Sequence, residues 1–313
     1  MLKLNFINDS IISNLKRFLL LNIILISLIY GNMAGQMGYE KEQVTFGIKQ
    51  WDPVHIKVDE KNRNSNTPMI TFFGSNSTYY PFVIKIKFTV LENLAPNQSE
   101  REQLIKHGAT NLFTLSPKVL NKSYGFQYSY NYWLKPSDEE ANEKFPYLIP
   151  IKEGKTVVGK QMSFGSISDS FILNKGDTVY CMRRGLVTAA PATETPYFRL
   201  SEHDCVEILH DDGTYLIYRY LDWRKVPVAP GTIVLPGQPV GFASDSGYVL
   251  VSLYKIVAPS NILQAQQINY AVGNGDPVTY TDINGTSVSI HPPEIIIREM
   301  KKGEIRKMKN DGK

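Results

Sequence analysis

The chain has 313 residues, of which 42% are hydrophobic and 11% aromatic, and its formal net charge is +4. This composition supports ordinary buried cores, and the length suits more than one domain. Half of the positive surplus lies in the first 35 residues, where Lys3, Lys16 and Arg17 outnumber Asp9. The remaining chain carries a net charge of only about +2, the total of +4 less the +2 of this segment, so we expect no nucleic acid partner.

Residues 1–35 have the pattern of a secretory signal peptide, with a basic start, an apolar stretch from Phe18 to Tyr30 and small residues after it. The apolar stretch is shorter than the roughly 18 residues of a spanning helix. We therefore expect an exported protein, in the periplasm or at the cell surface. An uncleaved anchor is the alternative, because Asn32 and Met33 make a poor cleavage site. Only in that case do we expect contact with a membrane.

Residues 36–134 show the alternation of half-buried antiparallel strands. In 82–90, apolar residues at even positions alternate with polar or exposed ones, and turn-rich stretches separate such runs. Short strands between turns predict an immunoglobulin-like β-sandwich. Residues 100–107 are the exception, for which we expect one or two helical turns.

Five aromatic residues alternate along one predicted strand of this domain. A row of flat rings is typical of sugar-binding platforms, but alternating aromatics more often form the core face of a sandwich. We expect the core face. The residues are Tyr124, Phe126, Tyr128, Tyr130 and Tyr132.

A charged, strand-poor stretch marks the end of the first domain. We assign 135–150 as a linker, 151–258 as a second β-domain and 259–313 as hairpins followed by a solvated basic tail. Within the second domain, Asp212-Gly213 between two alternating runs predicts a hairpin.

Three segments of the second domain contain short motifs in a fixed order: Phe171–Val187, Cys205–Leu221 and Val226–Gly241. They resemble the lysostaphin-type zinc endopeptidases, which combine a ligand pair H-x-x-x-D with glycine-rich strands, a Y-x-H-L motif and a closing H-L-H. The resemblance covers roughly a third of the chain. It implies an antiparallel β-domain with an open groove, which in active members holds peptidoglycan over the metal. More weakly, residues 75–83 resemble the sandwich that precedes such domains in secreted proteins of Bacteroidetes-like bacteria.

The ligand positions of that family are replaced throughout. Ser166 and Ser170 stand at H-x-x-x-D, Tyr220 stands at the catalytic histidine, and the closing motif falls on Val249–Val251, with a slip of one residue allowed. A catalytic zinc site needs about three protein ligands and one water. We therefore expect no catalytic residue, no zinc and no other cofactor. The expected groove is lined by Ser166, Ser170, Tyr220, Val249 and Val251.

Other polar residues offer a weaker route to a metal site. Asp169 lies next to the aspartate position, but neighbouring residues in a strand point to opposite faces, so we expect it to face away from the groove. His203 and His291 are expected to be solvated. His210 matches a histidine of the family that is not a ligand, and we expect a strand-end residue.

Cys181 and Cys205 are the two cysteines of the chain. In the resembling fold they lie on neighbouring strands, and an oxidising compartment permits a disulfide between them. Two buried thiols are the equal alternative, because Cα geometry cannot be obtained from sequence.

These observations together predict an all-β protein with an immunoglobulin-like β-sandwich followed by a lysostaphin-type antiparallel β-domain. The function we expect is that of a non-catalytic cell-envelope protein with a pseudo-peptidase domain, which binds peptidoglycan or a partner protein. The alternatives are an active cell-wall metalloendopeptidase whose site is misaligned here, and a structural subunit of a surface assembly.

Overall fold

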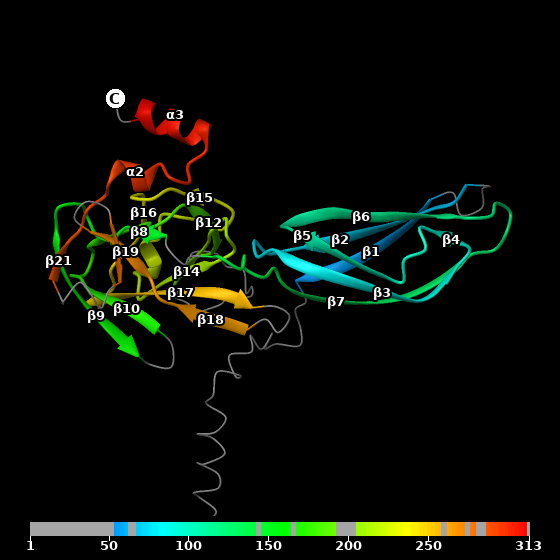
Figure 1. The fold of residues 1–313 in the computed structure, drawn as a ribbon, viewed down its shortest axis with the longest axis horizontal. Helices are drawn as coiled ribbons and strands as arrows, with labels where there is room; N and C mark the ends of the chain where they lie inside the picture. Colours follow the sequence, from blue (N-terminus) through cyan, green and yellow to red (C-terminus); the bar gives the residue numbers. More distant parts are fainter. Residues whose placement is uncertain are drawn as a thin grey trace, which may run out of the picture. The chain divides into compact units, whose positions relative to one another are not determined.

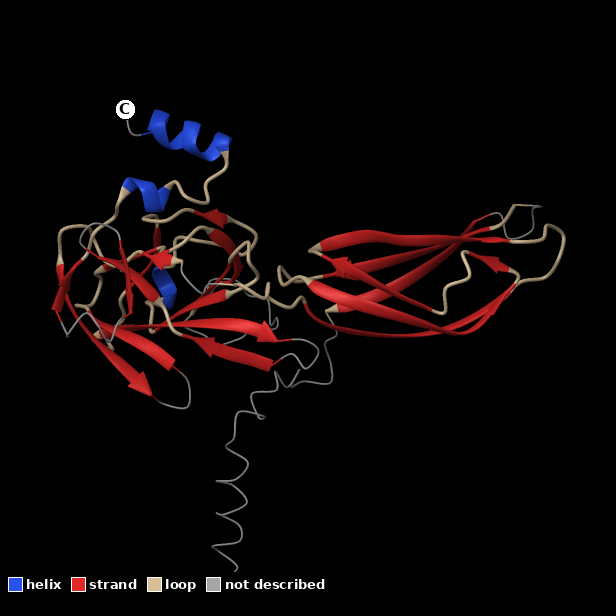
Figure 2. Ribbon diagram, viewed as in Figure 1, coloured by secondary structure: helices blue, strands red, loops and turns tan. Residues whose placement is uncertain are grey.

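The computed structural model describes the residues from 53 to 311 with several gaps, and the predicted signal peptide lies outside them. The described ranges are 53–61, 67–141, 145–163, 167–191, 205–257, 262–272, 276–279 and 286–311. Strands dominate these ranges, which confirms the predicted all-β class (Figure 2). Among the described residues, no helix has the length and apolar character needed to cross a membrane.

The first domain consists of two antiparallel sheets, with strand orders β1-β2-β6-β4 and β5-β3-β7 (Figure 1). The alternation predicted in β3 is confirmed, because Phe82, Ile84, Ile86 and Phe88 are all buried. The strands are β1 Val54–Lys61, β2 Met69–Asn76, β3 Phe82–Glu92, β4 Leu94–Ala95, β5 Glu100–Ile105, β6 Gly108–Pro117 and β7 Gly125–Leu134.

Aromatic side chains hold the two sheets together. Phe72 of β2 stacks on Phe113 of its own sheet at 4.7 Å between ring centroids. Across the interface it meets Phe88 at 5.6 Å, Phe126 at 5.7 Å and Tyr128 at 5.1 Å, each edge to face. The face-to-face packing is that of a β-sandwich, and it places the predicted aromatic row of β7 on the core side.

The helical turns expected in residues 100–107 are wrong. This segment is strand β5, paired in antiparallel register with β3. Lys85 of β3 lies 2.9 Å from Glu100 and 3.3 Å from Glu102, so opposite charges face each other across the pair. Such cross-strand partners lie far apart in sequence, and local propensity does not report them.

We predict that Phe72→Ala lowers the free energy of unfolding by about 3–5 kcal/mol, because it removes a fully buried ring that touches both sheets. Urea denaturation of the full chain measures the change. Val119→Ala is the control, since Val119 is 55% exposed and its truncation should cost less than about 0.5 kcal/mol. A Phe72→Ala protein as stable as the control would contradict this description of the core.

The second domain is built on a nine-stranded sheet with the order β15-β12-β13-β14-β17-β10-β9-β21, in which β18 also pairs with β17. Two small sheets, β11-β16 and β20-β19-β8, accompany it. The strands are β8 Pro146–Tyr147, β9 Thr156–Ser163, β10 Ile167–Ile172, β11 Thr178–Tyr180, β12 Gly185–Ala189, β13 Val206–Leu209, β14 Tyr215–Arg219, β15 Ile233–Val234, β16 Pro239–Phe242, β17 Tyr248–Val257, β18 Ile262–Gln266, β19 Asn269–Val272, β20 Asp276–Thr279 and β21 Thr286–Val288.

The predicted hairpin at Asp212-Gly213 joins β13 to β14. Gly213 has a φ of 81°, in the left-handed region that favours glycine. The turn closes with a hydrogen bond from the amide of His210 to the carbonyl of Thr214, at 2.9 Å. This hairpin sets the start of β14 at Tyr215, and the strand then ends at Arg219.

The segments on either side of 151–258 also belong to this domain. Residues 146–150, within the predicted linker, are buried, and β8 pairs with β19. Residues 259–313 form the predicted hairpin as β19 and β20, but the basic tail is not simply solvated. It forms the helices α2 (Pro293–Ile296) and α3 (Lys302–Asp311).

Candidate functional site

Of the positions predicted to line a groove, Ser170 lies on β10, Val249 and Val251 lie on the adjacent strand β17, and Tyr220 directly follows β14, which pairs with β17. Ser170 pairs with Leu250, and Leu250 pairs in turn with Arg219. Two residues further along β10, Ile172 pairs with Tyr248 of β17. Directly paired residues project from the same side of a sheet, so these five residues share one face. We call it the Tyr248 face.

Val249 and Val251 lie on the opposite face and are fully buried in the hydrophobic core with Phe171 and Tyr218. The sequence had suggested that they line one groove with Ser170, and this prediction is wrong. The reason is register: Ser170 pairs with Leu250 rather than Val251, and a shift of one residue exchanges the two faces of a strand. Ser166 lies outside the described residues.

Tyr220 directly follows β14, and its ring meets that of Tyr248 edge to face at 5.0 Å between centroids. Its φ of 64° is in the left-handed region, which costs a residue other than glycine roughly 1–2 kcal/mol. Neighbouring backbone bonds hold it there: the amide of Ser244 donates to the carbonyl of Tyr220 at 3.2 Å, and Asp222 donates to Phe242 at 2.8 Å. Strain of this kind persists only where the surroundings impose it.

Large side chains close to Tyr220 and Tyr248 in the sequence or the sheet remain open to solvent. Trp223, in a short 3₁₀ helix over Trp223–Lys225, is 55% exposed, and Ile172 is 60% exposed. The guanidinium of Arg224 lies 5.0 Å from the Trp223 ring. Sequence reasoning missed Tyr248 because it placed the closing motif one residue later, on Val249–Val251. It missed Trp223 and Ile172 because neither stands at a ligand position of the resembling family.

Asp169 lies on the core side of β10, away from Ser170, as expected. One of its carboxylate oxygens, Oδ2, accepts a hydrogen bond of 2.7 Å from the hydroxyl of Tyr270, and Oδ1 is buried without a hydrogen-bond partner among the described residues. Burial raises the pKa of Asp169 to about 6, although the bond from Tyr270 lowers it. Asp169 is thus a buried carboxyl group within the core.

We predict that Asp169 destabilises the fold as the pH rises. Its folded pKa lies above the ordinary value, so the folded state holds the proton more tightly than the unfolded state. The wild type should therefore lose stability relative to Asp169→Asn between about pH 4 and pH 7, at roughly 1.4 kcal/mol per unit of pKa shift. Urea denaturation of both proteins at several pH values measures this. A constant difference over that range would show that Asp169 does not titrate with a raised pKa.

The other candidate metal ligands do not assemble. His291 is half-buried beside Ser289 and Ile149, with its Nε2 at 3.4 Å from an oxygen of each. His203 lies outside the described residues. Within the ranges that the structure describes, no group of three histidine, cysteine, aspartate or glutamate side chains could hold a metal ion.

His210 is a buried residue just after β13, as expected for a strand end. Its Nδ1 donates a hydrogen bond to the carbonyl of Arg184 at 2.8 Å. Burial and the nearby charge of Arg183 lower the pKa of His210, so the imidazole is neutral at neutral pH. The histidine supports the β13–β14 hairpin.

Cys181 and Cys205 are two separate buried thiols, not joined by a disulfide. The Sγ of Cys181 donates to the carbonyl of Arg183 at 3.0 Å, and the Sγ of Cys205 lies 3.8 Å from Glu207 Oε1. Burial raises the pKa of Cys181 to about 12, so it is an unreactive thiol.

Two consecutive arginines before β12 are almost fully buried, with 4% and 3% of their side chains exposed. Arg183 binds Glu299 through two hydrogen bonds of 2.9 and 2.6 Å, and Asp212 at 2.8 Å. Burial by itself lowers the pKa of Arg183, but these acidic partners raise it above its ordinary value. The guanidinium therefore stays charged inside the domain.

Arg184 binds the C-terminal helix. Its Nη2 lies 2.9 Å from the carboxylate of Glu304 in α3, and its Nη1 lies 3.0 Å from Asp211 in the hairpin turn. Residues 299–304 are thus fixed to the β13–β14 hairpin by charge. Nothing in the sequence pattern around 183–184 indicated that both arginines would be buried.

No protein-family model matches this sequence, and no curated protein matches it. Among solved structures, this chain is similar to two crystal structures of Helicobacter pylori Csd3. The orthorhombic form is 12% identical, with 82% of this chain and 83% of that chain covered, and the hexagonal form is 13% identical, with 82% and 81% covered. Both have a TM-score of 0.28, which supports no conclusion about function.

Proposed function

We propose that this is a non-catalytic protein of the cell envelope whose second domain, a degenerate lysostaphin-type β-domain, binds peptidoglycan through the Tyr248 face. The observation that supports this most is the pair of Tyr220 and Tyr248. With the closing motif moved by one residue, both tyrosines stand where the resembling family has catalytic histidines, and their rings touch. The backbone holds Tyr220 in a strained conformation that places its ring there.

The chemistry of this face suits a glycan with peptide branches. Tyrosine and tryptophan rings offer flat surfaces that stack on sugar rings, and the tyrosine hydroxyls add hydrogen bonds. Arg219 projects from the same face, and its hydrogen bonds go to the hydroxyls of Ser252, at 2.8 Å, and Tyr254, at 3.5 Å. Neither of these partners carries a negative charge that would offset the charge of the guanidinium. The stem peptides of peptidoglycan carry carboxylates that such a cation attracts.

The residues of this face do not fit a zinc ion. Ser170, Tyr248 and Leu250 of this face, and Tyr220 in contact with it, provide no imidazole and no carboxylate, which are the usual protein ligands of catalytic zinc besides cysteine. We therefore assign no hydrolytic step to these residues.

A partner protein of the envelope is the second candidate ligand. Exposed Trp223 favours it, because tryptophan, tyrosine and arginine are enriched at the centres of protein interfaces. Retention on purified peptidoglycan sacculi distinguishes the two ligands and also tests against a purely structural role in a surface assembly.

We predict that Tyr220→Asn weakens retention on sacculi without unfolding the protein. Asparagine tolerates a positive φ, so the variant should keep or slightly raise its stability, by up to about 1 kcal/mol, while it loses the aromatic ring. Co-sedimentation of the purified full chain with sacculi measures retention, and thermal unfolding measures stability.

Tyr124→Asn in the first domain is the matched control, because it removes the same ring from a half-buried position away from the Tyr248 face. Trp223→Ala should weaken retention in the same direction as Tyr220→Asn. Unchanged retention in both variants would exclude the Tyr248 face as the binding surface. A large loss of melting temperature in Tyr220→Asn would mean that this ring serves the core instead.

We also predict that the purified protein contains less than about 0.1 equivalent of zinc, because a catalytic site requires three ligands that this face does not supply. Elemental analysis after removal of loosely bound metal measures the content. Zinc near one equivalent that disappears on mutation of Ser170 or Tyr220, together with release of peptidoglycan fragments, would instead support an active hydrolase.

A further inference from the structure

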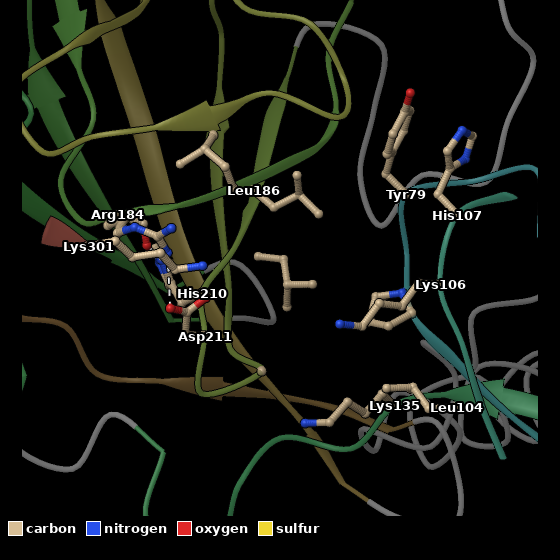
Figure 3. A pocket seen from close by; sticks show the side chains of 14 residues that line it. Tyr79, Leu104, Lys106, His107, Lys135, Arg184, Leu186, His210, Asp211 and Lys301 are labelled. Carbon is tan, nitrogen blue, oxygen red and sulfur yellow. Dashed lines mark hydrogen bonds and ion pairs between the residues drawn. The ribbon is translucent and has the colours of Figure 1, made fainter. Parts of the chain in front are cut away.

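A second candidate site lies at the other end of β14 from Tyr220. It is a pocket of about 360 Å³ beside the β13–β14 hairpin, lined also by residues of the first domain (Figure 3). This volume lies in the range of small-molecule sites. None of its lining residues belongs to the Tyr248 face, so this pocket is independent of the site in the proposed function.

The charge of the pocket is strongly positive. Lys106, Lys135, Arg184 and Lys301 line it, against one carboxylate, that of Asp211. Figure 3 shows Lys106 and Lys135 extending toward the side on which Arg184, Lys301 and Asp211 gather. Cations that converge on one cavity favour a negatively charged ligand.

The carboxylate of Asp211 does not neutralise these lysines. It lies 3.0 Å from Arg184, which also binds Glu304. The ammonium group of Lys135 lies 3.5 Å from Asp138, whose side chain is 63% exposed, and donates to the carbonyl of Pro136 at 3.4 Å. Lys106 and Lys301 form no ion pair within 4.0 Å in the part of the chain that the structure describes, although the Glu304 carboxylate lies beside Lys301 and accepts from its backbone amide at 2.7 Å. Two or three ammonium groups therefore remain available to a ligand.

The remaining wall is apolar and aromatic. Tyr79 and His107 stack with their ring centroids 4.0 Å apart and their planes at 19°. Ile233 and Leu104 leave 45% and 36% of their surfaces exposed while lining the pocket. A ligand that consisted of an inorganic anion alone would leave these apolar surfaces uncovered.

We infer that this pocket binds a small organic anion, in which a carboxylate or phosphate is attached to an apolar or aromatic group. The anionic group contacts Lys106 and Lys301, and the apolar group packs beside Ile233 and Leu104. Both anions satisfy the same lysines, so the choice between them is left to experiment.

The test uses three small probes on the full chain: N-acetylphenylalanine, its neutral amide, and phenyl phosphate. Isothermal titration at low salt should show saturable binding of at least one anion, with the amide at least about fivefold weaker, as expected for loss of exposed ion pairs. The double variant Lys106→Ala/Lys301→Ala should bind the anion at least about fivefold more weakly than the wild type. Added salt should lower the affinity of the wild type for the anion. Binding of one anion alone would identify the carboxylate or the phosphate as the natural group.

The control variant is Lys118→Ala/Lys122→Ala, which makes the same change of charge at exposed positions outside the pocket. It should bind like the wild type. Equal affinity for the amide and the anions, equal affinity in the two double variants, or no saturable binding of either anion would each overturn the proposal. All four lysines are exposed, so thermal unfolding should show intact folds throughout.

Discussion

The second domain depends on the burial of two charged arginines. Taking a guanidinium out of water costs several kcal/mol, and only well-placed carboxylates offset that cost. Arg183 and Arg184 obtain theirs from two separate places, the hairpin turn at 211–212 and the C-terminal residues Glu299 and Glu304. Removing one acidic partner would leave its buried arginine with a single carboxylate. The sheet, the hairpin and the C-terminal helix are therefore held in one arrangement.

That arrangement defines both candidate sites through a single strand. The hairpin fixed by the arginines starts β14 and lines the cationic pocket. The same strand ends at Arg219, immediately before Tyr220 and the Tyr248 face. The two sites are thus joined by one strand, and the ligands proposed for them differ in chemistry.

The sequence predicts those features that depend on neighbours along the chain. Alternation in residues 82–90 indicated a strand because burial alternates residue by residue, and Asp212-Gly213 indicated a turn because glycine permits its backbone geometry. Strand β5 could not be predicted, because it is stabilised by pairing with β3, where Lys85 forms an ion pair with Glu100. Local sequence does not show such a partner on another strand. The predicted register of β17 was wrong for the same reason. The pairing of β17 with β10, and not the sequence motif, decides which residues lie on the same face as Ser170.

The long separation of the arginines from their partners affects how the protein is made. Glu299 and Glu304 lie 116 and 120 positions after Arg183 and Arg184. A ribosome or export channel that releases the chain from its N-terminus delivers strand β12 long before these acids. Until then, the arginines can pair only with Asp211 and Asp212 of the hairpin turn, which follow them by 27 and 29 positions. The contacts of Arg183 with Glu299 and of Arg184 with Glu304 can therefore form only after residue 304 has been synthesised.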